Sequence, residues 1–423
     1  MLELYNNLKG DFMKKIIALS IITSSLLLAN GYKIPEQSIN GMALSAANVA
    51  NAHGADANYY NPANMVFNKD KNSYEFLMSY IHLNKIEFDN QNGEIYESRD
   101  EDYLIPLFHF SSKDYNNFRW GLSITTPAGL SKKWDDPVPE LGAKEFTLKT
   151  VELNPNIAYK VNNNFGIAFG IRALRSEGIA NAFRAGLYSQ YLNGDSIDFG
   201  WNAAASYQND KRDTKIALTY RSKINMTLNG DASGYYSKFL LTGNPDDIST
   251  LISFKTNGKV KIPLPAALNL AFAKTFNKTT LEFVLERTFW SDYKELDFNL
   301  NDPYVEGIFG TPIPKHWKDA NSYRIGLTHQ CNKKLTAMLG FTYDETPVPD
   351  DTIDFSLPDS DKQIFSGGFK YKMDDRMKLG FSVLYAKQKE RSVIMKQSDG
   401  TPIQGTFKDG GALLMAFGID YSF

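Results

Sequence analysis

The stretch LTAMLGFTY, residues 335–343, places an apolar side chain at every second position. Leu335 and Phe341 share one face of an extended strand, and small or polar residues share the other face. The same period of two recurs in FGIAFGIR (165–172) and in MKLGFSVLY (377–385). Segments of this kind form antiparallel strands, either in a soluble sandwich or in a barrel whose apolar face points toward lipid.

The lengths of the connections decide between these two folds. Short turns alternate with long segments such as Ser176–Gly194 and Leu228–Gly258, which we predict to be loops. Outer-membrane barrels show this alternation, and a Greek-key sandwich has no reason to keep it. We predict an all-β transmembrane antiparallel barrel over residues 71–423, with about 14 strands, an even number as in bacterial barrels. The strands begin near Ser73, Glu101, Asn117, Thr147, Asn164, Asp195, Asp213, Lys259, Lys278, Asp319, Lys333, Ser360, Asp375 and Gly410.

The N-terminus carries the pattern of a secretory signal peptide. Met13 starts a positively charged segment, and an apolar run from Ile16 to Leu28 follows it. Small residues at 29–31 offer a cleavage site, which leaves a mature chain that begins close to Tyr32. We interpret residues 1–30 as an upstream extension plus this signal peptide.

The composition excludes several classes of function. A formal net charge of -2 argues against a nucleic-acid interface. Cys331 is the single cysteine, so an internal disulfide framework and a multi-cysteine metal site are excluded. The histidines are scattered, and we find no HExxH, GxSxG or Walker motif. The sequence therefore predicts no enzyme activity, no cofactor and no metal site.

Residues 31–70 have a different character from the strands that follow. The segment is rich in Ala and Asn and contains little apolar mass. Such a segment cannot bury enough surface to fold alone. Two interpretations remain open: a disordered linker, or a hatch that plugs the lumen of the barrel.

The motif ADANYYNPA, residues 55–63, resembles the hatch signature of the FadL family of outer-membrane transporters. The triplet Asn61-Pro62-Ala63 is its most recognisable part. The segments Leu281–Leu296, Trp317–Asp350 and Leu357–Asp361 are also similar to that family. The resemblance implies transport of long-chain fatty acids or other hydrophobic compounds, with capture at extracellular loops, an internal pocket, hatch movement and lateral exit through the barrel wall.

In that family the lateral exit lies at a kink in the third strand. The matching strand here is Phe118–Leu130, which contains Pro127 and Gly129. Proline removes a ladder donor and glycine packs no side chain, so both weaken pairing. An opening near Gly129 is one interpretation, and the other is that Pro127 simply ends the strand.

Two aromatic segments are candidate landing sites for the ligand. They contain Phe183, Tyr235, Tyr236 and Phe239, and clustered aromatic residues on a loop suggest an apolar groove. Packing of each segment against the barrel rim is the alternative. Arg184 and Lys238 could attract a carboxylate, and ordinary surface charge is the alternative for each of them.

Two arginines lie within predicted strands. Facing lipid at mid-depth, Arg172 and Arg324 would each cost about 2–4 kcal/mol, so both are expected to point into the lumen. There they could pair with hatch acids such as Asp56 or Glu36, or bind a ligand head group. Together the candidate ligand and gating residues are Tyr32, Ile34, Asn61, Pro62, Ala63, Pro127, Gly129, Arg172, Phe183, Arg184, Tyr235, Tyr236, Phe239 and Arg324.

The expected partners follow from the interpretation of the chain as an outer-membrane transporter. They are a hydrophobic ligand, outer-membrane lipids, and the barrel assembly machinery through the terminal aromatic Phe423. We expect a monomer in the Gram-negative outer membrane. A polar-solute porin and a surface adhesin that uses the long loops are the alternative functions.

Overall fold

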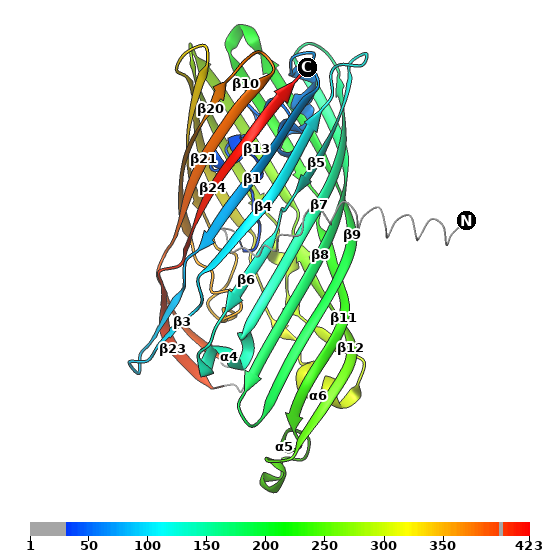
Figure 1. The fold of residues 1–423 in the computed structure, drawn as a ribbon, viewed down its shortest axis with the longest axis vertical. Coiled ribbons are helices and arrows are strands. Elements are labelled where there is room, and N and C mark those ends of the chain that lie inside the picture. The colour runs from blue at the N-terminus through cyan, green and yellow to red at the C-terminus, as the bar shows by residue number, and fades with distance from the viewer. Residues whose placement is uncertain (1–30, 397–400) are drawn as a thin grey trace, which may run out of the picture.

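The computed structural model describes residues 31–396 and 401–423, which form a closed antiparallel β-barrel around a folded N-terminal segment (Figure 1). One sheet of 18 strand segments makes the wall. Four wall strands are interrupted, so these segments form 14 strands. β1 (Ser73–Leu83) pairs with β4 (Glu101–Ser111) on one side and with β24 (Gly411–Ser422) on the other, which closes the barrel. The predicted fold class is confirmed. The predicted signal peptide lies outside the described residues.

The remaining wall strands are either continuous or broken once. The continuous strands are β7 (Glu145–Lys160), β8 (Phe165–Arg184), β9 (Tyr188–Asn209), β18 (Ala320–Gln330), β19 (Leu335–Asp344), β20 (Lys362–Lys372) and β21 (Met377–Gln388). The broken strands are β5/β6 (Phe118–Thr125, Gly129–Lys133), β10/β11 (Thr214–Arg221, Ile224–Ser237), β12/β13 (Leu251–Leu264, Ala267–Phe276) and β14/β16 (Thr279–Thr288, Phe298–Leu300).

The other elements lie in the connections and in the N-terminal segment. The connections contain β2 (Glu87–Asn90), β3 (Ile95–Glu97), β22 (Arg391–Lys396), β23 (Pro402–Lys408), β15 (Glu295–Leu296), β17 (Ile313–Pro314), α4 (Pro137–Ala143), α5 (Phe239–Thr242), α6 (Pro303–Phe309), η2 (Asp210–Arg212), η3 (Pro245–Asp247) and η4 (Trp290–Asp292). The N-terminal segment contains α2 (Ile39–Ala43), α3 (Ala57–Tyr60) and η1 (Pro62–Phe67). No helix among the described residues is long and apolar enough to cross a membrane.

The wall strands turn large apolar side chains outward. Phe169 is 50% exposed, Phe199 58% and Leu270 53%, whereas Ala168 and Ala271 are buried on the inner face. Every second residue therefore meets lipid, as the period of two requires. The short turns gather at the end that holds the C-terminus, and the long connections gather at the opposite end (Figure 1).

Two hairpins at the end with the long connections extend much further than predicted. β8 runs to Arg184 and pairs with β9 from Tyr188, so most of the predicted loop 176–194 is strand. β11 and β12 pair likewise from Ile224 to Ser237, so much of the predicted loop 228–258 is strand as well. The loop predictions were wrong because these strand ends carry polar residues on their outer face, and polar residues remove the apolar alternation that identifies a strand.

The N-terminal segment is a compact plug inside the barrel, so the plug interpretation is confirmed. Asp56 holds it together, because its Oδ2 atom accepts hydrogen bonds from Ser38 (2.7 Å), Asn40 (3.0 Å) and Asn48 (3.1 Å). The wall approaches it closely at Gly340, where a Cβ atom would lie 2.2 Å from the Leu44 carbonyl carbon. Glycine is therefore required for this contact between wall and hatch.

Candidate functional site

The third wall strand is interrupted between β5 and β6, at residues 126–128. β4 pairs with β5 through only four residue pairs, from Phe108↔Ile124 to Ser111↔Gly121. β6 pairs with β7 but, among the described residues, not with β4. Because the strand resumes at Gly129, Pro127 interrupts the strand rather than ending it. Over most of its length, β4 therefore has no strand of the described chain hydrogen-bonded to it on this side of the wall.

The hatch supplies backbone hydrogen bonds at this gap. Ile34 N donates to Pro127 O at 2.9 Å, and Gly129 N donates to Tyr32 O at 2.9 Å. Lys33 forms a bridge with Ala128 between these two bonds. Because buried backbone groups need partners, the segment 32–34 holds the inner side of the gap like a short added strand. The candidate residues Tyr32, Ile34, Pro127 and Gly129 thus meet in one place.

Gln37 extends this contact with its side chain. Its Nε2 atom donates to Thr126 O at 2.8 Å, and Thr126 N donates to its Oε1 atom at 2.8 Å. The His109 ring contacts the Gln37 carbonyl at 2.7 Å from the neighbouring strand β4. The sequence did not identify Gln37 or His109 as site residues, because a single buried polar residue gives no periodic signal.

The triplet Asn61-Pro62-Ala63 lies in the core of the hatch. Asn61 Nδ2 donates to Val49 O at 2.9 Å, and Pro62 starts the helix η1. Ala63 is fully buried, and its carbonyl would be 2.8 Å from a Cβ atom at Gly166 of β8. The triplet therefore shapes the hatch and seats it on the wall, but it does not line the gap.

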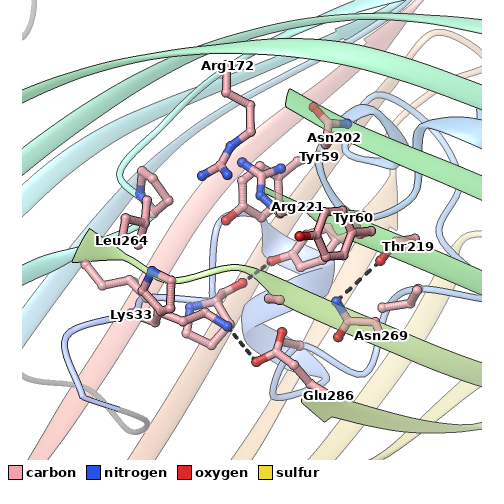
Figure 2. A pocket seen from close by; sticks show the side chains of 18 of the residues that line it. Lys33, Tyr59, Tyr60, Arg172, Asn202, Thr219, Arg221, Leu264, Asn269 and Glu286 are labelled. Carbon is pink, nitrogen blue, oxygen red and sulfur yellow. Dashed lines mark hydrogen bonds and ion pairs between the residues drawn. The ribbon is translucent and has the colours of Figure 1, made fainter. Parts of the chain in front are cut away.

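A cavity of about 60 Å³ lies between the hatch and the wall. Four of its lining residues are cationic, namely Lys33, Arg172, Arg221 and Arg324, and one, Glu286, is acidic. Figure 2 shows Arg172 and Arg221 close to Tyr59, with Lys33 paired to Glu286 on another side. This volume holds only a few water molecules, so no alkyl chain fits without movement of the hatch or of side chains.

The partners of the two predicted strand arginines differ from our expectation. Arg172 Nε donates to Glu152 at 2.8 Å, and Arg221 contacts the same carboxylate. Arg324 Nη2 donates to Glu286 at 3.2 Å. The expected pairing with Asp56 or Glu36 is not present, because wall carboxylates on neighbouring strands already occupy these guanidinium groups.

The hatch contains two buried acids, Asp56 and Glu36, that each leave one carboxylate oxygen without a hydrogen bond. Glu36 is 3% exposed, and its Oε2 atom has no hydrogen bond in the structure. Burial raises the pKa of Glu36 to about 7, although the nearby Arg324 acts in the opposite direction. Burial likewise raises the pKa of Tyr59 to about 12. Glu36 therefore changes its charge near neutral pH.

An aromatic cluster covers the hatch on the side of the long connections. The Tyr32 ring lies 4.8 Å from Trp290 and 5.7 Å from Trp317, between ring centroids. Tyr293 lies 4.9 Å from Trp317, and Trp290 is fully buried. Tyr32 therefore contacts the gap through its backbone carbonyl and the aromatic cluster through its ring.

An apolar groove lies further out, on the inner face of the two long hairpins. Its floor is a row of directly paired glycines on four neighbouring strands: Gly178, Gly194, Gly230 and Gly258. Strand spacing gives this row a length of about 14 Å. Its walls are mainly apolar, with Phe146, Ile179, Ala180, Leu192, Leu228, Ala232, Val260, Ile262, Phe298 and Leu300.

The predicted landing residues lie on the two hairpins that carry this groove, four of them on strands and Phe239 in a connection. Phe183 and Arg184 end β8, Tyr235 and Tyr236 lie on β11, and Phe239 starts α5. Tyr236 is buried in the cluster that includes Leu192 and Leu300, whereas Lys238 pairs with Asp247 at 2.9 Å. The expectation of aromatic loops is therefore corrected to aromatic strand ends, since these hairpins continue as strands.

The relatives of this chain agree with this architecture. Residues 20–423 match the family of outer membrane transport proteins described as OMPP1/FadL/TodX. The chain belongs to this family. It is an outer-membrane β-barrel of a family of hydrophobic-compound transporters, which are channels and not enzymes.

Individual relatives are similar at low identity. The long-chain fatty acid transport protein of Escherichia coli O6:H1 (strain CFT073) is 24% identical over 352 residues, which cover 75% of this chain and 77% of that protein. The structure of a Pseudomonas aeruginosa FadL homologue superposes with a TM-score of 0.80 at 18% identity, and covers 92% of this chain and 99% of that one. The Ralstonia pickettii toluene transporter TbuX gives a TM-score of 0.69 at 15% identity, over 91% and 98%. These two structures support the fold alone.

Proposed function

We propose that this member of the family takes up long-chain fatty acids. The single observation that carries the proposal is the hatch segment 32–34, which completes the inner side of a gap in the wall. A ligand that displaces this segment opens a path from the lumen to the lipid bilayer. The route then never requires an apolar chain to enter bulk water.

The glycine-floored groove suits the first step, capture from outside. Burial of about 0.8 kcal/mol per methylene makes transfer of a chain of roughly sixteen methylenes favourable by on the order of 10 kcal/mol. A floor without side chains lets an alkyl chain lie flat across four strands. Capture therefore needs no energy source, and release is the difficult step.

The cavity beside the hatch suits the carboxylate. Its lining contains four cations, which pair with only two carboxylates, Glu152 and Glu286, so the remaining positive charge favours an anion over a neutral molecule. Arg221 lies 4.6 Å over the Tyr59 ring, which holds the guanidinium at the cavity wall (Figure 2). A neutral aromatic ligand is the second candidate, because the cluster of Tyr32, Trp290 and Trp317 offers aromatic faces.

A reversible cross-link tests the gating step. Lys33 and Ala128 are bridge partners, so a Lys33→Cys/Ala128→Cys variant in a Cys331→Ser background can lock the hatch across the gap. We expect oxidation to stop transfer of hexadecanoate into liposomes and reduction to restore it. A Ser73→Cys/Ser422→Cys pair, which joins two adjacent wall strands, is the control. Unchanged transfer through the locked hatch would reject the lateral route, and equal transfer of toluene and hexadecanoate would reject the preference for fatty acids.

A further inference from the structure

The outer face of the long hairpins changes character at a defined height. On β9 the outward residues Tyr207, Trp201, Phe199 and Ile197 are 40–58% exposed and apolar or aromatic. At a rise of about 3.3 Å per residue and a tilt of about 40°, the distance from Tyr207 to Ile197 covers about 25 Å, the height of a complete apolar band. The next outward residue, Asp195, is charged, so the hydrocarbon region ends between Ile197 and Asp195.

The strand does not end there. Asp195, Asn193 and Tyr191 continue the same outward face and lie about 5, 10 and 15 Å above the band. The head groups of an ordinary phospholipid reach only about 5–7 Å above the hydrocarbon core. The outer face of these hairpins therefore extends beyond the head groups of an ordinary phospholipid.

A depression of about 330 Å³ lies on this outer face, across β7, β8, β9 and β11. The side chains that give it polarity are Lys149, Arg175, Glu177, Asn193, Asp195 and Asp231. The glycines 178, 194 and 230 also line it, so only a thin wall separates it from the apolar groove on the inner face.

The chemistry of the depression fits the hydroxyl groups of a sugar, because Arg175 is paired with Glu177 (2.9 Å) and Asp195 (3.8 Å) and the cations free for phosphate lie at the border. Asn and Asp side chains provide the donors and acceptors that hydroxyl groups need. Tyr191, 39% exposed, adds a flat apolar surface with a polar end. Lys259 lies opposite Asn229 on the next strand, and the exposed Lys255 and Lys261 continue this row, so cations border the depression. Lysine and arginine provide charge-assisted bonds to phosphate.

We propose that this depression and the lysine row of β12 bind the phosphorylated saccharide head group of a glycolipid in the outer leaflet. The acyl chains of that lipid then lie against the apolar band below, from Ile197 to Tyr207. Binding at this site holds the two hairpins upright in the saccharide layer, with the apolar groove open above the membrane.

Native mass spectrometry of the detergent-purified protein tests this site, with purified lipopolysaccharide as the probe. We expect a Lys149→Gln/Lys259→Gln variant and a Tyr191→Ala variant each to lose at least ten-fold in retained lipopolysaccharide. A Lys333→Gln/Lys334→Gln variant, changed at exposed residues in a turn at the opposite end, should retain it as the parent does. Heat-modifiable migration in gels verifies that each barrel is folded.

Two further probes separate the source of binding. Dephosphorylated lipopolysaccharide should bind at least ten-fold more weakly than the intact lipid, and phosphatidylglycerol should not compete. Retention within two-fold in both site variants, equal loss in the control variant, or equal binding of either further probe would overturn the proposal.

Discussion

Replacement of Gln37 by Ala should loosen the hatch at the wall gap without unfolding the hatch. Gln37 is 1% exposed, and its side chain satisfies both the N–H and the carbonyl of Thr126. Truncation leaves these two backbone groups without partners beside a gap that β4 does not fill. Each unsatisfied buried group costs about 1–3 kcal/mol, so the contact between the hatch and the interrupted strand should weaken by about 2–6 kcal/mol.

Hydrogen exchange at Gly129 measures this loss directly, because its amide donates to Tyr32 O in the hatch. A loss of about 2 kcal/mol, the lower bound, accelerates exchange at this amide by roughly 30-fold. Transfer of fatty acid into liposomes should become faster in the same variant, since the closed state is less favoured.

Asn64→Ala is the matched control. Asn64 Nδ2 donates to the carbonyls of Val49, Ala50 and Ala52 within the hatch, and its Oδ1 atom accepts from Ser206 and Gln208 of β9, a wall strand other than the interrupted one. This substitution should increase exchange inside the hatch much more than at Gly129. The proposed role of Gln37 in holding the hatch at the gap is refuted if Gln37→Ala leaves exchange at Gly129 within three-fold of the parent. It is also refuted if Asn64→Ala accelerates exchange at Gly129 as much as Gln37→Ala does.

Three other substitutions test separate parts of the route. Arg221→Ala should reduce retention of hexadecanoate, measured by lipid extraction, at least ten-fold more than retention of toluene, because one of four lining cations is lost. Gly178→Val should fill the groove and displace the flexible Leu228 side chain, which a Cβ atom would meet at 2.7 Å. Capture of the fatty acid in a stopped-flow assay should therefore become slower, whereas Gly367→Val should not slow it. Burial raises the pKa of Glu36 from 4.5 to about 7, so hatch docking should weaken by about 3 kcal/mol as pH rises through this range, and Glu36→Gln should abolish this dependence in hydrogen exchange.

The wall was largely predictable because its information is local. Period-two alternation, short turns and the position of Pro127 are all visible within a dozen residues of sequence. The long hairpins were missed because strand pairing continues from Ser176 to Arg184 above the apolar band, where the outer face no longer meets lipid. Register and pairing there depend on the partner strand, which a sequence pattern cannot report.

The interior was less predictable because its partners are far apart in the chain. Arg324 could be placed in the lumen from the cost of facing lipid, but Glu286 lies 38 residues away and on another strand. Glu152 and Arg221 were not predicted as site residues for the same reason, because their partners also lie far away in the sequence. An acidic residue within a predicted strand is also expected to face the lumen, because a charged side chain that faces lipid is unfavourable. This argument would have identified Glu152 and Glu286.

The interrupted wall strands have a common physical consequence. In a continuous strand the backbone N–H and carbonyl groups form hydrogen bonds with the neighbouring strands. At an interruption, carbonyl groups are left without these partners and can accept hydrogen bonds from residues inside the barrel. Pro127 O in strand three accepts from the hatch residue Ile34, and Ser222 O, between β10 and β11, accepts from Arg172 at 2.7 Å. Breaks in separate wall strands thus hold the hatch segment and a cavity arginine, which ties the opening of the wall to the position of the hatch.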